Sequence, residues 1–335
     1  MKLVVQIPCL NEEETLPLVV ASIPRQIPGI DVVEVLVVDD GSTDRTIEVA
    51  RELGVDHIVR NTGRRGLAHS FAAGVHEALR QGADIIVNTD GDNQYPQAMI
   101  PALVEPILAG RADMVVADRQ VRTIAHFSPI KRLLQRFGSR VVNMAAGTAV
   151  ADAASGFRAY SREAALRLNV VTDFSYAMET LVSAGRKRLA IAHVPVTTNP
   201  KTRESRLFKN IFEHVARSGG AILRSYAMFR AYTVFLLAGG FFIVLASLPY
   251  LRFLYWVAVR SPEASGHVQS LVIGGVLGMF GLVLIVLGVL ADLLSVNRKL
   301  MEDLLLRVKR LEYGDAASPI QSDAAQDVLE RALRE

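Results

Sequence analysis

The chain has 335 residues, half of them hydrophobic, and a formal net charge of only +3. This length allows one large domain or two modest ones, and so small a net charge gives no reason to expect a nucleic-acid partner. The single cysteine, Cys9, excludes an internal disulfide and suits a reducing compartment.

The first 200 residues alternate short apolar strands with helical segments. The apolar run before Pro8 is too short for a signal peptide, so it is predicted to be the first strand. The predicted strands span residues 3–7, 33–38, 58–60, 85–89 and 113–117; the predicted helices span residues 12–23, 43–53 and 67–81, the first capped by Asn11. This alternation indicates βαβ units, so the predicted fold class is α/β, Rossmann-like, with a mostly parallel sheet.

Polar clusters follow three of these strands, after residues 7, 38 and 89. In parallel sheets, ligands bind at the carboxyl ends of strands near a reversal of strand order, so we expect the clusters to share one crevice. Their residues are Pro8, Asn11 and Glu12 in the first, Asp39, Asp40, Gly41, Ser42 and Asp44 in the second, and Asp90, Gly91, Asp92 and Gln94 in the third.

The third cluster is the candidate metal site. Asp90 and Asp92 stand one residue apart at the end of an apolar strand, and Gln94 follows. Carboxylate oxygens suit a hard divalent cation that bridges the oxygens of a diphosphate. For this motif taken alone, the alternative is a turn that merely contains two aspartates.

The first two clusters have two interpretations each. One carboxylate of the pair Asp39 and Asp40 can accept hydrogen bonds from a base or a ribose. Alternatively, the second cluster only caps the following helix, through Ser42, Thr43 or Asp44. Asn11 could likewise be only a helix cap.

Three further segments carry candidate anion contacts. Residues 63–68 open a helix, and a helix N-terminus beside cations binds anions, although the Gly-Lys-Ser/Thr end of a P-loop is absent. Residues 155–158 and the basic string 200–206 follow later, and arginines suit forked contacts with phosphate. The alternative for the basic string is a solvated face.

Two long uncharged runs, residues 231–251 and 268–291, are predicted to cross a bilayer. Each meets the requirement of about 20 apolar residues for a hydrocarbon core about 30 Å thick. Lys and Arg flank the pair on its outer sides, whereas the loop between the runs holds only Arg252 and Arg260. This predicts a hairpin in the cell inner membrane, with the N-terminal domain and both termini in the cytoplasm. A pair of buried core helices is the alternative.

Flanking segments complete the expected domains. In residues 205–230, Lys and Arg residues are interspersed with apolar residues. This pattern predicts an amphipathic helix on the inner leaflet or, alternatively, a connector packed on the N-terminal domain. Residues 292–335 are expected to form a cytoplasmic helix followed by a tail. This helix could associate with a second copy of the chain to form a homo-oligomer. The expected domains are therefore residues 1–204, 205–230, 231–291 and 292–335.

In their order and spacing these motifs resemble the inverting glycosyltransferases of family two, which have the GT-A fold. The resemblance is strongest to the branch that glycosylates polyisoprenyl phosphates, typified by dolichyl-phosphate mannose synthase, and it covers about residues 1–215. The matched elements are Pro8 with Asn11 and Glu12, residues 37–42, residues 65–68, residues 90–92 with Gln94, Arg119, residues 155–157 and residues 204–207.

The resemblance implies a role for each matched residue. Catalysis would rest on Asp92, Arg119 and Arg203, although whether Lys201 or Arg203 takes the family's arginine role stays open. Mg²⁺ or Mn²⁺ would lie on Asp92 and Gln94. The nucleotide-sugar would meet Pro8, Asn11, Glu12, Asp39, Asp40, Arg65, Gly66, Asp90, Gly91, Asp92 and Arg206. The acceptor would meet Lys131, Arg132, Ser155 and Gly156.

The expected function is transfer of a sugar from a UDP- or GDP-linked donor to a polyisoprenyl phosphate at the cytoplasmic membrane face. The alternatives are a glycosyltransferase for another membrane lipid or glycan acceptor, and a catalytically silent membrane scaffold. A processive polysaccharide synthase fits less well, because the one tryptophan, Trp256, lies between the predicted spans and not in a Gln-x-x-Arg-Trp motif. The identity of the sugar is not readable from these motifs.

Overall fold

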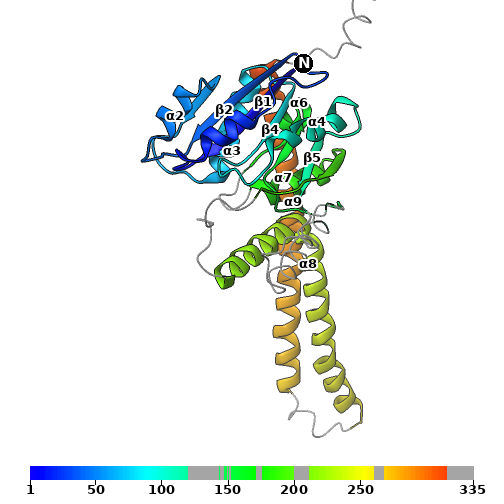
Figure 1. Ribbon diagram of the computed structural model, residues 1–335. Helices are drawn as coiled ribbons and strands as arrows, with labels where there is room; N and C mark the ends of the chain where they lie inside the picture. The colour runs from blue at the N-terminus through cyan, green and yellow to red at the C-terminus, as the bar shows by residue number, and fades with distance from the viewer. Residues whose placement is uncertain are drawn as a thin grey trace, which may run out of the picture. The chain divides into compact units, whose positions relative to one another are not determined.

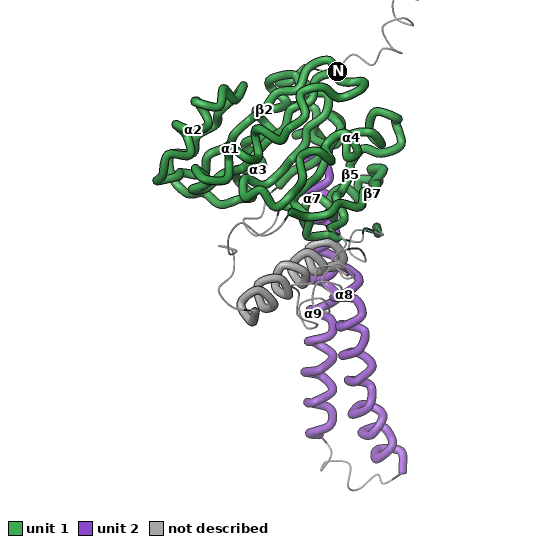
Figure 2. The backbone as a smooth tube through the Cα atoms, viewed as in Figure 1, with its two compact units in different colours: residues 1–219, 305–335 green, residues 220–304 purple. Residues whose placement is uncertain are grey.

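The computed structural model describes residues 1–119, 143, 147–148, 150, 152–170, 176–199, 211–259 and 268–314, without the side chains of residues 211–231. By its contacts the chain divides into two units, one of residues 1–219 with 305–335 and one of residues 220–304 (Figure 2). The end of the chain therefore groups with the N-terminal residues, although the sequence-based boundaries set residues 292–335 apart.

The first unit is built on a sheet whose described strands have the order β3-β2-β1-β4-β6-β5-β7 (Figure 1). β6 runs antiparallel to β4 and β5, and the other pairs are parallel, which confirms the predicted α/β class with a mostly parallel sheet. The strands are β1 (Lys2–Cys9), β2 (Val32–Asp39), β3 (His57–Arg60), β4 (Ile85–Asn88), β5 (Met114–Asp118), β6 (Arg158–Ser161) and β7 (Ile191–Pro195).

Helices cover both faces of the sheet, because its central strands are apolar on both sides. On one face, α1 and α4 pack into a core cluster with alternate residues of β1 and β2, such as Val5 and Val35. On the other face lies α3, so near that a Cβ on Gly74 would fall 2.9 Å from Val38 Cγ2. The α-helices of the first unit described before α8 are α1 (Leu16–Ser22), α2 (Thr46–Glu52), α3 (Leu67–Arg80), α4 (Ile100–Leu108), α6 (Arg162–Arg167) and α7 (Tyr176–Arg186).

The first helix begins later than the sequence predicts. The prediction started it at Glu12 with Asn11 as its cap, but α1 starts at Leu16. Glu12 O accepts a hydrogen bond from Thr15 N at 3.1 Å, which closes a turn ahead of the helix. Pro17 then stands in the first helical turn, where its missing N–H costs nothing and its fixed φ suits the helix. The prediction that Asn11 caps this helix is therefore wrong.

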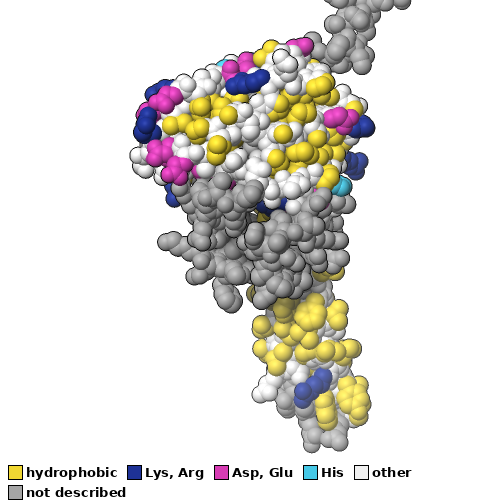
Figure 3. All heavy atoms as spheres, viewed as in Figure 1, with side chains coloured by type: hydrophobic (Ala, Val, Ile, Leu, Met, Phe, Trp, Pro, Cys, Tyr) yellow, Lys and Arg dark blue, Asp and Glu magenta, His cyan; other side chains and the backbone are white. Residues whose placement is uncertain are grey.

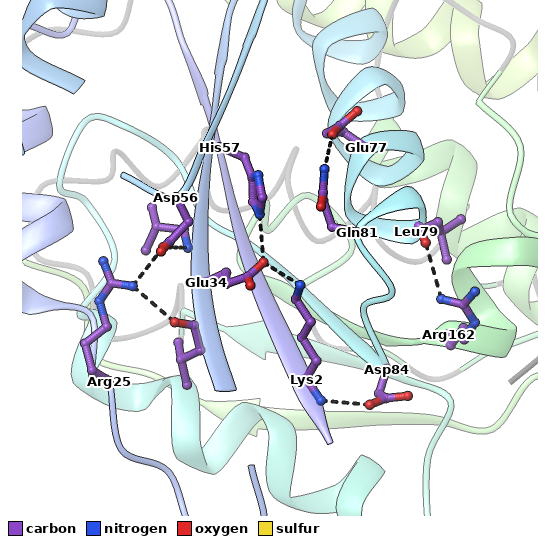
Figure 4. Close-up of polar contacts among 12 residues, drawn as sticks. Lys2, Arg25, Glu34, Asp56, His57, Glu77, Leu79, Gln81, Asp84 and Arg162 are labelled. Carbon is purple, nitrogen blue, oxygen red and sulfur yellow. Dashed lines mark hydrogen bonds and ion pairs between the residues drawn. The ribbon is translucent and has the colours of Figure 1, made fainter. Parts of the chain in front are cut away.

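At the amino ends of the strands, a charged cluster ties three strands together (Figure 4). Lys2 Nζ of β1 and His57 Nε2 of β3 each lie 2.7 Å from Glu34 Oε2 of β2. Burial alone would raise the pKa of Glu34, but the contacts with Lys2 and His57 outweigh it and lower that pKa. This cluster lies at the end of the strands away from the polar clusters, so it stabilises the sheet without entering the candidate site.

The second unit consists of the apolar parts of two long helices, α8 (Ile211–Val259) and α9 (Val268–Tyr313). The stretches Tyr232–Val259 and Val268–Tyr313 are long and apolar enough to cross a membrane. Their outer surface is apolar (Figure 3), and five hydrophobic residues expose between 65% and 71% of their area: Leu237, Val244, Val276, Met279 and Leu294. Such a surface is foreign to water-soluble proteins and disfavours the alternative of buried core helices. The two helices fit a transmembrane hairpin.

Glycines let these two helices pack closely. A Cβ on Gly239 of α8 would fall 2.8 Å from Gly281 O of α9, and a Cβ on Gly281 would fall 2.9 Å from Gly239 O. The two backbones are therefore in reciprocal contact at this level. In lipid, helices associate through such van der Waals packing, because the apolar surroundings supply no hydrophobic driving force between them.

The last turns of α9 belong to the first unit. Lys309 is 5% exposed, and its Nζ donates to Leu168 O at 3.1 Å and to Asn169 Oδ1 at 2.7 Å. Arg162 of α6 donates to Tyr313 O at 2.6 Å. These contacts attach the C-terminal end of α9 to α6 and to the residues that follow α6.

Gly239→Ala is expected to destabilise the helix pair, because the added Cβ would press on Gly281 O. Overpacking of this kind costs about 1–3 kcal/mol. Gly240→Ala is the matched control, since nothing lies within 4 Å of a Cβ there and alanine is the better helix former. Thermal unfolding in detergent, followed by circular dichroism, compares the two variants. Equal transition temperatures would contradict the close packing.

Lys309→Ala is expected to lower the free energy of unfolding of the first unit by about 1–3 kcal/mol, because the buried Leu168 carbonyl and the partly buried Asn169 side chain lose their donor. Lys299→Ala, which removes an exposed lysine of the same helix, is the control. Protease susceptibility of the detergent-solubilised protein across a denaturant series measures the difference. A Lys309→Ala protein as resistant as the Lys299→Ala protein would show that the contact contributes nothing.

Candidate active site

The three polar clusters meet at one edge of the sheet, as the sequence predicts. Asn11 N donates to Ser42 Oγ at 2.9 Å, so the first cluster contacts the second. Thr15 Oγ1 lies 2.7 Å from Gly91 O, so the residues after β1 also contact the third. The strand order reverses at β1, which has β2 on one side and β4 on the other. This is the position at which parallel sheets bind ligands.

Asp40 organises the start of α3. Its Oδ1 accepts hydrogen bonds from Arg65 N at 2.9 Å and from Asn61 Nδ2 at 3.1 Å, and its Oδ2 accepts one from Gly66 N at 2.9 Å. Gly41, with φ of 80°, allows close contact here, because a Cβ on it would fall 2.8 Å from the Gly63 carbonyl carbon. The carboxylate therefore fixes the loop that opens α3.

Asp39 retains an acceptor at the end of β2. Its Oδ1 accepts from Ser42 N at 3.1 Å. Its Oδ2 is buried without a hydrogen bond in the described part of the chain, and it lies 3.8 Å from Arg60 Nε. A buried acceptor left in this state is a feature of functional sites. The capping interpretation holds for Asp44, whose Oδ1 accepts from Thr46 N at 3.0 Å at the start of α2.

The acidic turn, residues 90–94, follows β4 in a tight conformation. Asn93 has φ of 56°, in the left-handed region that asparagine tolerates better than most residues. Asp92 Oδ1 accepts from Gln94 N at 3.1 Å. A Cβ on Gly91 would fall 3.1 Å from Cys9 Sγ, so glycine lets the turn approach the end of β1.

Negative charge on the acidic turn is costly. Burial, and after it the Asp92 carboxylate, raises the pKa of Asp90 to about 7, against the opposing effect of Arg119. Desolvation and a like charge both disfavour the ionised form of a carboxyl group. A divalent cation beside these two carboxylates would offset their repulsion.

The donor set fits Mg²⁺ or Mn²⁺. Among the described residues, no three His, Cys, Asp or Glu side chains form a metal-binding group. The acidic turn nonetheless offers two carboxylates, of Asp90 and Asp92, and the amide oxygen of Gln94. Mg²⁺ commonly binds through one or two carboxylates together with phosphate oxygens of its substrate. These residues therefore suit a cation that arrives with a diphosphate.

Arg119, which follows β5, forms a forked ion pair with Asp152. Its Nε donates to Asp152 Oδ2 at 2.6 Å and one terminal nitrogen donates to Oδ1 at 3.0 Å. The Arg119 side chain is 15% exposed and that of Asp152 is fully buried. Burial would raise the pKa of Asp152, but Arg119 outweighs it and lowers that pKa. The contact with Asp152 fixes the guanidinium of Arg119, whose charge acts to lower the pKa of Asp90.

Gly156 packs directly against the Asp90 carboxylate. A Cβ on Gly156 would fall 3.1 Å from both Asp90 carboxylate oxygens and 2.7 Å from Tyr176 Oη. Gly156 N donates to Tyr95 Oη at 3.1 Å, and Asn88 Nδ2 donates to Gly156 O at 2.8 Å. Only a glycine leaves room for the carboxylate at this point.

The remaining predicted residues differ in accessibility. Pro8 and Glu12 are buried at the end of β1, and Ser155 is fully buried beside Gly156. Arg65 is exposed at the start of α3, with one terminal nitrogen 3.2 Å from His69 Nε2. Outside the described residues lie Lys131, Arg132, Arg203 and Arg206.

Several residues of the site were not predicted from the sequence. Asp152 pairs with Arg119, and Asn88, Tyr95 and Tyr176 surround Gly156. Arg158 was predicted as a candidate anion contact within residues 155–158, and that prediction is wrong. Its side chain is fully buried and donates to the carbonyls of Ala153, Ser155 and Ala177, so it shapes the segment that carries Asp152. For Asp152, the one available signal was its proximity to the matched residues 155–157 in the sequence.

Comparison with protein families and relatives gives consistent matches. The model of the family "Glycosyl transferase family 2" matches residues 4–168. Glycosyltransferase AglJ of Haloferax volcanii is 30% identical over 91% of this chain and 96% of that protein. Polyprenol monophosphomannose synthase of Mycolicibacterium smegmatis is 28% identical over 57% of this chain and 75% of that protein. Dolichol-phosphate mannosyltransferase of Pyrococcus furiosus is 32% identical over 64% of this chain and 62% of that protein.

Solved structures of glucosyl-3-phosphoglycerate synthase from Mycobacterium tuberculosis are similar in fold. The complex with Mn²⁺, UDP-glucose and phosphoglyceric acid has a TM-score of 0.53 at 25% identity and covers 68% of this chain and 78% of that chain. The complex with Mg²⁺ and UDP has a TM-score of 0.53 at 25% identity and covers 67% and 78%.

In metal-free protein, Asp90→Asn is expected to gain stability over the native chain as the pH rises. The native carboxyl ionises near pH 4 in the unfolded chain, but only near about 7 in the folded chain. The relative stability of the native chain is therefore highest below about pH 4, falls up to about pH 7 and then levels off. Thermal unfolding in EDTA from about pH 4 to 8 tests this, and a pH-independent difference would contradict it.

Proposed function

Because the chain belongs to glycosyltransferase family 2, in its polyisoprenyl-phosphate branch, we propose that it transfers a sugar from a nucleotide-sugar to a polyisoprenyl phosphate, with inversion at the anomeric carbon. The observation that carries the proposal is the meeting of three polar strand ends at the reversal of the sheet, with the acidic turn among them. Relatives named as polyprenol, undecaprenyl or dolichol phosphate mannosyltransferases support the acceptor class.

The nucleotide half of a UDP- or GDP-sugar would occupy the edge between β1 and β2. Asp39 would accept hydrogen bonds from the base or ribose, since its Oδ2 has no hydrogen bond within the described residues. Asp40 would act through the loop it fixes, because its carboxylate already accepts hydrogen bonds from the amides of Arg65 and Gly66. The exposed Arg65 side chain at the start of α3 would then contact phosphate. The other nucleoside contacts would come from the first cluster, at Pro8, Asn11 and Glu12.

The diphosphate would lie against the acidic turn. Mg²⁺ or Mn²⁺, bound by Asp92 with Asp90 or Gln94, would neutralise the charge of the departing nucleoside diphosphate. The similar M. tuberculosis enzyme was solved with either cation and a uridine nucleotide, which supports this choice of metals. Gly91 keeps the turn close to the end of β1, so the metal and nucleoside sites adjoin.

The transfer itself needs little proton abstraction. A phosphate monoester has its second pKa near about 6, so the acceptor oxygen is already largely ionised at neutral pH when it attacks the anomeric carbon. The bond from that carbon to the diphosphate oxygen breaks in the same step. The larger obstacle is charge, since two unit charges about 4 Å apart repel by roughly 4 kcal/mol at an effective dielectric of about 20.

Cationic side chains would offset this repulsion. Arg119 is held in place by Asp152 and carries its charge beside the acidic turn. The other assigned cations, outside the described residues, are Lys131 and Arg132 for the acceptor phosphate and Arg203 and Arg206 for the donor. For Ser155 and Gly156 we propose support of Asp90 in place of direct acceptor contact, because Ser155 is fully buried and Gly156 packs on the carboxylate.

We place the hairpin, residues 231–291, in the cell inner membrane, with the catalytic domain, residues 1–204, and both termini in the cytoplasm. The basic residues outside the two runs and the exposed apolar surface of α8 and α9 support this topology. Residues 205–230 would lie on the inner leaflet as an amphipathic helix, and residues 292–335 would return to the cytoplasm. This arrangement brings the catalytic domain to the depth of the lipid phosphate.

Membranes that carry the protein, supplied with radiolabelled UDP- and GDP-sugars and with undecaprenyl- or dolichyl-phosphate, test the proposal. We expect label to enter the organic phase as a lipid-phosphate-sugar, and EDTA to stop the transfer. Asp92→Ala is expected to lower the rate by about 100-fold or more, on the scale of losing preorganised transition-state stabilisation. Glu14→Ala, which removes an exposed carboxylate after β1, is the control and should retain full activity.

Three outcomes would contradict parts of this proposal. Near-native turnover by Asp92→Ala would remove that residue from the mechanism. Transfer that survives EDTA would argue against the divalent cation. Label that reaches another lipid or a glycan, but not polyisoprenyl phosphate, would replace the acceptor while leaving the family assignment intact.

A further inference from the structure

The segment after β7 crosses over the acidic turn. Val196 N donates to Asp118 O at 2.8 Å, so the segment leaves the sheet beside the end of β5. Asn199 then contacts the turn through both its backbone and its side chain. Asn199 N donates to Gln94 O at 3.0 Å, and its Nδ2 donates to Asn93 O at 3.0 Å. Residues more than 100 positions apart in the chain are thereby joined at the candidate metal site.

These contacts act where the turn needs support. Asn93 occupies the left-handed region, and only a residue without a β-carbon adopts that region at no cost. Within the described residues, Thr15 Oγ1 lies 2.7 Å from Gly91 O on one side of the turn. Asn199 binds two successive carbonyls on the other side, of Asn93 and Gln94. The loop that presents Asp92 is thus held from two directions.

The chemistry of the side chain suits this position. A carboxamide donates hydrogen bonds without bringing a charge next to Asp90 and Asp92. An aspartate here would oppose its oxygens to the carbonyls of the turn and add a third negative charge. A lysine would supply a cation that competes with a metal. Asparagine is the neutral donor of the right reach.

Asn199 also stands directly before the basic string, which lies outside the described residues. The next residue is Pro200, and a residue before proline is restricted to extended conformations. Asn199 therefore has a restricted backbone, two hydrogen bonds to the acidic turn, and a covalent connection to Lys201 and Arg203.

We propose that Asn199 is a positioning residue, which holds the acidic turn in its metal-binding shape and fixes the point from which the basic string begins. The proposal rests on the proposed function, because it assigns the metal and the diphosphate to this turn. Asn199 touches neither reacting group. Its effect would pass through the backbone of Asn93 and Gln94 and so through Asp92.

The test uses the full-length protein in detergent and three variants. Asn199→Ala removes the side-chain donor, and Asn199→Asp keeps the shape but replaces the donor with a charge. Thr197→Ala is the matched control, because it truncates an exposed side chain on the same segment. Two readouts are taken: amide hydrogen exchange of a peptide covering residues 89–97, and calorimetric binding of GDP and of UDP over a series of Mn²⁺ concentrations.

We expect Asn199→Ala to speed exchange in residues 89–97 and to raise the Mn²⁺ concentration for half-maximal nucleotide binding by about three- to tenfold, as for the loss of one hydrogen bond. Asn199→Asp should produce the larger shift, and Thr197→Ala should match the native protein in both readouts. A purely structural role would leave the Mn²⁺ dependence of nucleotide binding unchanged.

The outcomes separate the two proposals. If the native protein binds neither GDP nor UDP in the presence of Mn²⁺, the proposed function is contradicted. The hydrogen-exchange comparison still tests the positioning role of Asn199 in that case. Unchanged exchange of residues 89–97 in Asn199→Ala overturns the positioning role. The positioning role is also overturned if the native and Asn199→Asp proteins bind a nucleotide with the same Mn²⁺ dependence. The proposed function is unaffected by that result.

Discussion

The concentration of carboxylates at one end of the sheet is the constraint to which the rest of the site responds. Four aspartates, at positions 39, 40, 90 and 92, stand at the ends of β2 and β4, the two strands that flank β1 where the strand order reverses. Each unit of buried charge must meet a donor, a cation or a proton. Backbone amides at the start of α3 donate to Asp40, and the charge of Arg119 acts to lower the pKa of Asp90. The raised pKa of Asp90 reflects its burial and the like charge of Asp92, which these partners do not fully offset. In the proposed function, a divalent cation would offset the remaining repulsion.

The sequence predicts the parts of the fold whose cause is local. β1, β2 and β4 are mostly apolar, and the polar residues that follow them already indicate where a ligand binds. β6 and β7 were not predicted. β6 is a four-residue strand that contains Arg158, and β7 is an edge strand with partly exposed residues, so neither shows the apolar run of a buried strand. Their place in the sheet is decided by pairing with distant strands.

The residues of the candidate site likewise fall into those predicted from the sequence and those that only the fold reveals. Asp90, Asp92 and Asp40 were predicted because each directly follows a recognisable strand. Asp152 and Asn199 were not, because their meaning lies in contacts with Arg119 and with the acidic turn, which follow other strands. The role of Asp40 also depends on tertiary structure, since only the fold shows that its carboxylate accepts hydrogen bonds from two backbone amides of the α3 loop. Spacing along the chain identifies chemical groups, whereas their engagement with one another is set by the fold.

The attachment of the end of α9 to α6 has a consequence for biosynthesis. The first unit is assembled from residues 1–219 and residues 305–335, and the two long apolar helices are made between them. A ribosome that has finished residue 219 has therefore produced a catalytic unit whose α6 surface still lacks Lys309 and Tyr313. That surface is completed only after both apolar helices have left the ribosome. The catalytic unit therefore finishes folding only after its membrane anchor has been synthesised. A fragment that stops before α8 lacks the α9 residues that pack on α6.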